Sequence, residues 1–238
     1  RVVELVGDAP GREVGRLDGA VENLAVEGDR AYAVRSCGGR VQPTETPDPA
    51  FGAMPMPPMF LSASPSYPTC LAVVDLKDAG PPVLSGEVPV SGDHYPHAIA
   101  VHDGTVYMAS HGEGIFLADA NGPGAPVLRP EAFAANLDWP VRMDNFDAGG
   151  YLGLLINGSM LYLGNHTTIA AFDVSTPSAP RPVAAYELAR GGYIESLSID
   201  DDRLYVTIGD AVGSPFALWV LEAPADAAEL LRAVEGMR

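Results

Sequence analysis

The chain has few basic side chains and almost no lysine. Among its 238 residues there are 14 Lys and Arg against 31 Asp and Glu, which gives a formal net charge of −17, and Lys77 is the only lysine. Proteins that bind DNA or RNA need clustered lysines and arginines to neutralise phosphates. The same shortage disfavours adsorption to an anionic membrane surface. The charge balance therefore excludes nucleic acid as the expected partner.

Long apolar runs and the common catalytic motifs are also missing from the sequence. No apolar run reaches the length of a membrane span. There is no G-x-S-x-G elbow, H-E-x-x-H helix, P-loop lysine or C-x-x-C pair. These absences leave no ready-made hydrolase, metalloprotease, nucleotide-binding or thioredoxin-like site.

Glycine and proline, in contrast, are abundant. The chain has 26 Gly and 22 Pro, and 47% of its residues are hydrophobic. This density of chain breakers interrupts helices too often and suits short strands joined by turns. The hydrophobic fraction is that of a globular protein with a sizeable core. We therefore expect an all-β domain.

Four segments of the chain repeat one hairpin pattern. Each has an alternating apolar strand, a short polar turn, and a second strand that carries a tyrosine. The strand pairs cover residues 23–26 and 31–34, 98–101 and 106–109, 153–156 and 161–163, and 196–199 and 204–206. Such regular spacing predicts a repeated unit built on a β-hairpin.

A third strand follows each hairpin and ends in an acidic residue before a proline-containing turn. A carboxylate at this place can accept hydrogen bonds from the backbone amides of the turn, so we interpret its recurrence as architectural. The acids, including one in the opening segment, are Glu4, Asp75, Asp119, Asp173 and Glu222.

These third strands carry a family resemblance. They read LAVVDL, IFLADA, IAAFDV and LWVLEA, and together with the hairpins they resemble the LVIVD-repeat family over nearly the whole chain. The resemblance implies a β-propeller of about four to five four-stranded blades, in which radial stacking buries both faces of each sheet. We expect one domain, 1–238, with units at roughly 1–17 (partial), 18–90, 91–146, 147–189 and 190–238.

The sequence leaves the closure of the ring open. The ending PADAAELLRAVEGMR fits either an outer strand or a terminal helix. If it is helical, a strand at 12–17 could complete the last blade. Otherwise the chain is part of a larger propeller, or another subunit completes it.

An insertion at 37–70 separates the second and third strands of the first full unit. It begins at Cys37 and ends at Cys70, where two neighbouring antiparallel strands part and rejoin. Because this brings the two thiols within bridging reach, we predict a disulfide; the alternative is two separate buried thiols. A disulfide in turn indicates an oxidising compartment, so the protein would be secreted, periplasmic or on the cell surface.

The stapled insertion is rich in methionine. Met54, Met56 and Met59 lie close to Phe60. Thioethers suit Cu(I), but they are also adaptable apolar contacts, and we favour a hydrophobic contact surface. A second insertion, at 130–150, separates the second and third full units.

Three histidines are expected at one rim of the propeller. By alignment of the repeats, His97 starts an inner strand opposite His111, and His166 matches His111 one unit later. Glu22 and Glu195 occupy the position of His97 in two other units. Three imidazoles with carboxylates nearby could hold copper, zinc or iron, could act as metal-free acid–base groups, or could form a hydrated polar lining.

Two functions from different classes follow. The first is a binding and interaction module for a protein or small-molecule ligand, with no catalysis of its own. The second is a metal-dependent enzyme, such as an oxidoreductase, with His97, His111 and His166 as ligands and Glu22 or Glu195 as catalytic candidates. Fold alone does not distinguish them.

Overall fold

The described part of the chain consists entirely of strands and their turns. In the computed structural model we describe residues 2–4, 12–15, 21–37, 69–76, 82–90, 96–110, 114–129, 153–164, 168–187, 193–209 and 217–226. Within these ranges no helix is present that is long and apolar enough to cross a membrane. The expectation of an all-β protein is confirmed.

The strands form antiparallel sheets in chain order, and we call each sheet a blade. Blade 1 contains β3 (Val21–Glu27), β4 (Arg30–Ser36), β5 (Thr69–Asp75) and β6 (Val83–Val90). Blade 2 contains β7 (Pro96–His102), β8 (Thr105–Ser110), β9 (Gly114–Asp119) and β10 (Val127–Leu128). Blade 3 contains β11 (Gly153–Asn157), β12 (Met160–Gly164), β13 (Thr168–Asp173) and β14 (Arg181–Glu187).

Two incomplete sheets lie at the ends of this series. Blade 4 has three strands in the described residues: β15 (Tyr193–Asp200), β16 (Arg203–Gly209) and β17 (Ala217–Glu222). A half-blade is formed by β1 (Val2–Glu4) and β2 (Arg12–Gly15), which pair with each other. One of the alternatives for closing the ring required the strand at 12–17 to complete blade 4. In this structure β2 pairs with β1 and does not join the sheet of blade 4.

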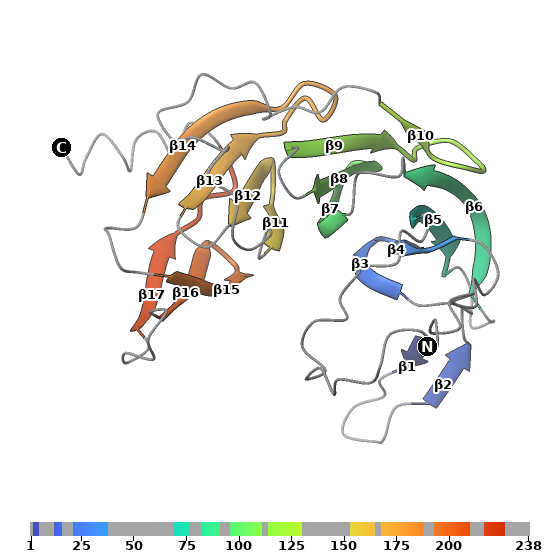
Figure 1. Ribbon diagram of the computed structural model, residues 1–238, viewed down its shortest axis with the longest axis horizontal. Helices are drawn as coiled ribbons and strands as arrows, with labels where there is room; N and C mark the ends of the chain where they lie inside the picture. The colour runs from blue at the N-terminus through green and yellow to red at the C-terminus, as the bar shows by residue number, and fades with distance from the viewer. Residues whose placement is uncertain are drawn as a thin grey trace, which may run out of the picture.

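The arrangement of the blades is that of a β-propeller. The sheets follow one another along an arc, with β3, β7, β11 and β15 on its inner side and the half-blade and blade 4 at its two ends (Figure 1). Neighbouring inner strands lie against each other, β7 against β3 and β11, and β11 against β15. The predicted propeller of four-stranded blades is confirmed.

Alternation along each strand builds a hydrophobic layer between every two blades. In blade 2, for example, Ile99 and Val101 pack toward blade 1, whereas Ala98 and Ala100 pack toward blade 3. A third layer joins blades 3 and 4 around Leu204. Because successive side chains point to opposite faces of a strand, one strand contributes to two layers.

The repeated tyrosine of the second strand joins blade 2 to blade 3 and blade 3 to blade 4. The Tyr107 hydroxyl of blade 2 donates a 3.1 Å hydrogen bond to the carbonyl of Pro177 in blade 3. The Tyr162 hydroxyl of blade 3 donates a 2.8 Å bond to the carbonyl of Pro224 in blade 4. Burial raises the pKa of Tyr107, so the hydroxyl stays protonated and available as a donor. These bonds give the tyrosine a structural role in blades 2 and 3.

We expect Tyr162→Phe to lower the free energy of unfolding by about 1–2 kcal/mol, because the buried carbonyl of Pro224 loses its donor. The equivalent residue of blade 4, Tyr205, is only half-buried. Urea denaturation of both variants checks this, and Tyr205→Phe should change stability by less than about 0.5 kcal/mol. Equal losses in the two variants would contradict a role for the inter-blade bond.

The recurrent acid caps the turn that follows the third strand. An Asp119 carboxylate oxygen accepts a 3.0 Å bond from the backbone amide of Asn121. In blade 3, Asp173 accepts a 2.9 Å bond from the amide of Ser175 and also pairs with Arg181. The architectural interpretation of the acid is thus confirmed in these two blades.

The Asp173 cap predicts a pH-dependent contribution to stability. The hydrogen bonds from Ser175, followed by the pairing with Arg181, hold the pKa of Asp173 below its usual value. A carboxyl whose pKa is depressed in the folded state stabilises above its unfolded pKa, and this stabilisation is lost as the pH falls through the folded pKa. We expect Asp173→Asn to cost about 1–2 kcal/mol at neutral pH. In thermal melts against pH, the difference from the parent should vanish in strong acid; a constant difference would contradict this.

Candidate functional site

The inner strands of three blades share an irregularity at the same position. In blade 1 the β3–β4 ladder shifts register between Val21 and Asn23, which leaves Glu22 as the extra residue. The same shift leaves out His97 between β7 and β8, and Glu195 between β15 and β16. Each of these residues lies five positions before the last residue of its strand, so the three blades carry equivalent β-bulges.

A β-bulge leaves one residue unpaired in the ladder and changes the direction of its side chain, and bulges are frequent beside binding and active sites. Here the three bulged positions carry two carboxylic acids and an imidazole. They lie near the start of the strands that face the centre of the arc (Figure 1). We call this end of the inner strands the bulge rim.

The histidine pairing expected from the repeats is wrong in register. Ser110 pairs with Pro96 and Ala109 with Ala98, so His97 lies at the bulge and does not face position 111 across the ladder. Counting from the His102–Thr105 pair beside the turn, a regular ladder would already place position 97 opposite Ser110, and the bulge shifts the pairing one residue further, to Pro96. His111, His166 and the side chains of His97 and Glu195 lie outside the described residues, and Glu22 is exposed. The proposed ligand set remains a prediction.

The predicted Cys37–Cys70 disulfide is present, with Cα atoms 5.2 Å apart. Cys37 follows the last residue of β4, and Cys70 is the second residue of β5, so the insertion leaves the blade at the bulge rim. Met54, Met56, Met59 and Phe60, like the 130–150 insertion, lie outside the described residues. The disulfide fixes both ends of the insertion to one point of the rim.

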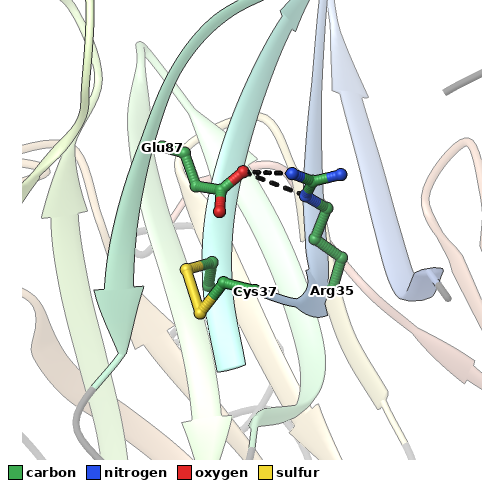
Figure 2. Close-up of a disulfide and its surroundings, with 4 residues drawn as sticks. Arg35, Cys37 and Glu87 are labelled. Carbon is green, nitrogen blue, oxygen red and sulfur yellow. Dashed lines mark hydrogen bonds and ion pairs between the residues drawn. A yellow bond between two sulfur atoms is a disulfide. The ribbon is translucent and has the colours of Figure 1, made fainter. Parts of the chain in front are cut away.

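An ion pair that the sequence did not suggest lies beside the disulfide. Arg35 of β4 donates a 3.0 Å hydrogen bond from Nε, and a second one from its terminal nitrogen, to a carboxylate oxygen of Glu87 on β6. Figure 2 shows the Glu87 carboxylate directed toward the guanidinium, with the disulfide next to both. Both side chains are largely buried.

The two sulfur atoms and a Glu87 oxygen lie within 4.8 Å of one another. This is a spacing that could suit a metal, but metals bind thiolates, and neither sulfur is a thiolate while the disulfide is intact. The group therefore acts as a structural anchor for the rim: a covalent bond joins β4 to β5, and a charge pair joins β4 to β6.

Removing the disulfide should destabilise the protein strongly. Cys37 and Cys70 are separated by 33 residues, and opening a loop of this size costs about 3–4 kcal/mol on loop-entropy grounds. We expect the Cys37→Ser/Cys70→Ser double variant to lose about this much stability in guanidinium denaturation. Dithiothreitol should lower the stability of the parent by a similar amount and leave the variant unchanged. A variant as stable as the parent would show that the insertion, when free, is already restrained by other contacts.

The opposite ends of the inner strands, at the hairpin turns, are used by the fold. Glu27 accepts hydrogen bonds of 2.7 Å and 2.8 Å from the backbone amides of Asp103 and Gly104, the turn of the next blade. Arg30 donates a 2.8 Å bond to the carbonyl of Ala120, also in blade 2. Both Asp103 and Gly104 have positive φ, at 48° and 64°, which exposes their amides to the Glu27 carboxylate.

A similar bond joins blades 3 and 4. Asn157 occupies the position of Glu27, and its side-chain amide donates to the carbonyls of Asp201, at 2.7 Å, and Ala223, at 2.6 Å. Sequence reasoning treated these residues only as parts of turns. The signal available was that a polar residue capable of side-chain hydrogen bonding ends each inner strand, at Glu27, His102, Asn157 and Asp200.

Comparison with known families gives no assignment by sequence. No protein-family model matches the chain. No curated protein matches it either.

Comparison of structures supports the fold. The chain is similar to a protein from Lactobacillus plantarum, with a TM-score of 0.53 and 13% identity. The aligned part covers 91% of this chain and 60% of that one. It is also similar to the Pseudomonas aeruginosa periplasmic gluconolactonase PpgL, with a TM-score of 0.51 and 13% identity, over 92% of this chain and 62% of that one. The computationally designed Ika4 protein matches with a TM-score of 0.50 and 12% identity, over 90% of this chain and 100% of that one. The chain thus spans about 60% of the two natural proteins, and at these identities the likeness concerns the fold alone.

Proposed function

We propose that this protein is an extracytoplasmic β-propeller of the LVIVD-repeat type that binds a protein or small-molecule ligand at the bulge rim. The observation that carries the proposal is the set of equivalent bulges at Glu22, His97 and Glu195. A bulge changes the direction of the side chain of its extra residue, and bulges are frequent next to active sites. Side chains join blades at both ends of the inner strands, at Glu27 and Asn157 beside the hairpin turns and at Asn23 beside the rim, so the bulges are what distinguishes the rim.

The disulfide supports a location outside the cytoplasm. Structural disulfides persist in oxidising compartments and are rare in the reducing cytosol. One of the similar structures is of a protein described as periplasmic. A secreted, periplasmic or cell-surface protein fits both observations, and the net charge of −17 would keep such a domain soluble.

The stapled insertion would supply the apolar part of the binding surface. Its two ends are held at the bulge rim by Cys37 and Cys70. Met54, Met56, Met59 and Phe60 would then contribute adaptable contacts close to the polar positions. A surface with both kinds of contact suits a ligand that has an apolar part and a polar or cationic part.

A second candidate function is a metal-dependent enzyme, such as an oxidoreductase. It is favoured by the presence of His97 at the bulge equivalent to Glu22 and Glu195. His97, His111 and His166 would hold copper, zinc or iron, and Glu22 or Glu195 would act as a base. This function requires that imidazoles from different blades meet at one point.

Photo-cross-linking can test the binding proposal by position. A photoreactive amino acid at Glu22 should capture one ligand of defined mass from the extracytoplasmic fraction. The matched control carries the same group at Asp201, an exposed residue of a hairpin turn, and should not capture that ligand because it lies at the other end of the strands. Capture at both positions, or at neither, would contradict binding at the bulge rim.

Metal analysis of the same protein decides between the two functions. We expect mass spectrometry of protein purified without chelator to find only substoichiometric copper, zinc and iron. Stoichiometric metal in the parent, lost in both His97→Ala and His166→Ala, would overturn the binding module in favour of the enzyme.

A further inference from the structure

The hairpin turns of blades 1 and 2 bring an imidazole and two carboxylates together. Glu27 is the last residue of β3, His102 is the last residue of β7, and Asp103 begins the turn that follows β7. The strands β3 and β7 lie against each other in neighbouring blades (Figure 1). One ligand atom from each of the three side chains lies within 4.8 Å of the other two. We call these three residues the turn triad.

The spacing within the turn triad is that of atoms that share one metal ion. Zinc binds imidazole nitrogen at about 2.0–2.1 Å and carboxylate oxygen at about 2.0–2.2 Å, so two such ligands of one ion lie no more than about 4.3 Å apart. The Nε2 atom of His102 is 3.8 Å from Oδ2 of Asp103, which is within this limit but too long for a hydrogen bond. The Asp103 side chain is 78% exposed, so it can adjust to an ion without displacing other groups.

The imidazole of His102 has no partner that would explain it. Its side chain is only 20% exposed, and among the described residues neither ring nitrogen takes part in a hydrogen bond. Polar groups removed from water are normally paired, because leaving them unpaired costs free energy. A metal ion between His102 and the carboxylates would supply the missing partner.

Neither carboxylate of the turn triad is neutralised by a basic side chain in the part of the chain that the structure describes. Arg30 stands opposite Glu27 in the β3–β4 ladder. Its guanidinium, however, lies 3.4 Å from Asp75 and donates a hydrogen bond to the carbonyl of Ala120. Glu27 and Asp103 therefore place two negative charges close together, and a divalent cation would make the triad neutral.

The fold already holds the Glu27 carboxylate in place. Its Oε1 accepts a 2.7 Å hydrogen bond from the amide of Asp103, and its Oε2 accepts a 2.8 Å bond from the amide of Gly104. Each carboxylate oxygen has a second lone pair, so these bonds orient the group and leave it able to bind a cation. Ligating carboxylates are commonly hydrogen-bonded in this way, which fixes the geometry of a metal site.

The equivalent junction of blades 3 and 4 has a different set of side chains. Asn157 takes the place of Glu27, while Asp200 and Asp201 take the places of His102 and Asp103. The amide of Asn157 donates a 2.7 Å hydrogen bond to the carbonyl of Asp201. The contact between turns therefore forms without an imidazole, and this junction serves as an internal comparison for the turn triad.

We propose that Glu27, His102 and Asp103 bind a divalent transition metal, with zinc as the expected ion, at the junction of blades 1 and 2. Imidazole and carboxylate ligands together suit zinc, whereas calcium and magnesium take oxygen ligands. The bound ion would join the two blades, and water would complete its coordination because Asp103 lies at the surface. The turn triad lies at the opposite end of the inner strands from the bulge rim and does not depend on the proposed function.

Titration with added zinc is the suitable test, because occupancy of a site open to solvent follows the free metal concentration and falls during purification. We expect isothermal titration calorimetry of the chelator-treated parent with zinc chloride to show one saturable site. Zinc should also raise the melting temperature of the parent, since it binds the folded state.

A matched pair of variants makes the test specific. Loss of even an outer-shell partner of a metal weakens binding about 10–100-fold, so Asp103→Asn should weaken zinc binding at least about tenfold. Asn also tolerates the positive φ of 48° at this position. Asp201→Asn, at an equivalent turn residue with φ of 52°, makes the same charge change and should leave zinc binding unchanged.

Two further variants identify the imidazole. His102→Gln should weaken zinc binding at least about tenfold, with circular dichroism as the check on folding. His97→Ala, at the bulge rim, should leave binding at the turn triad unchanged. Because Asp103 is exposed, Asp103→Asn tests the site even if His102→Gln disturbs the fold.

Four results would overturn the proposal: no saturable zinc binding, zinc binding that Asp103→Asn leaves intact, an equal loss in Asp103→Asn and Asp201→Asn, or equal affinity for calcium. Binding that is lost in His97→Ala and kept in Asp103→Asn would assign the ion to the bulge rim. Cross-linking of a ligand at Glu22 does not involve the turn triad, so failure here would leave the proposed function untouched.

Discussion

The structure depends on the burial of apolar sheet faces between neighbouring blades. A four-stranded sheet with apolar side chains on both faces cannot hide them alone, and each blade of this protein solves the problem by stacking on the next. The three hydrophobic layers between blades 1 and 4 follow from strict alternation along the strands. Hydrogen bonds from Tyr107 and Tyr162 to proline carbonyls then fix the spacing of neighbouring blades. On the face of blade 1 that is directed away from blade 2, the same alternation leaves Leu24 60% exposed.

This stacking gives the two ends of the inner strands different roles. At the hairpin turns, the side chains of Glu27 and Asn157 form hydrogen bonds with backbone groups of the next blade, so they help to hold the blades together. At the bulge rim, the extra residues Glu22, His97 and Glu195 have no place in the ladder. The rim also contains a bond between blades, since the Asn23 side chain of β3 donates a 3.3 Å hydrogen bond to the carbonyl of Pro96 in blade 2. The bulges, rather than a lack of contacts between blades, are therefore what distinguishes this end of the inner strands.

The disulfide and the Arg35–Glu87 pair give that rim a rigid edge in blade 1. Together they connect three adjacent strands where a long insertion leaves the sheet. Because a buried charge is costly unless it is paired, Arg35 and Glu87 hold each other in position. A loop anchored in this way can present a surface to a ligand while its ends stay fixed. This arrangement suits binding as well as it would suit catalysis, and only the metal content of the rim separates the two.

The sequence by itself determined the repeat, the strand order within each unit and the Cys37–Cys70 bond. It also determined the acid, Asp119 or Asp173, that caps the turn after the third strand. These features depend on contacts between residues close in sequence or at fixed offsets in adjacent strands, so a pattern reveals them. The register at His97 was predicted wrongly, because a regular count from His102 and Thr105 already places position 97 opposite Ser110. The bulge itself has no sequence signal that distinguishes it from a regular strand. The Arg35–Glu87 pair, the Glu27 contact with Asp103 and the exposure of Leu24 were decided only by tertiary structure. Each of these depends on which strands or blades become neighbours, and no local pattern specifies that.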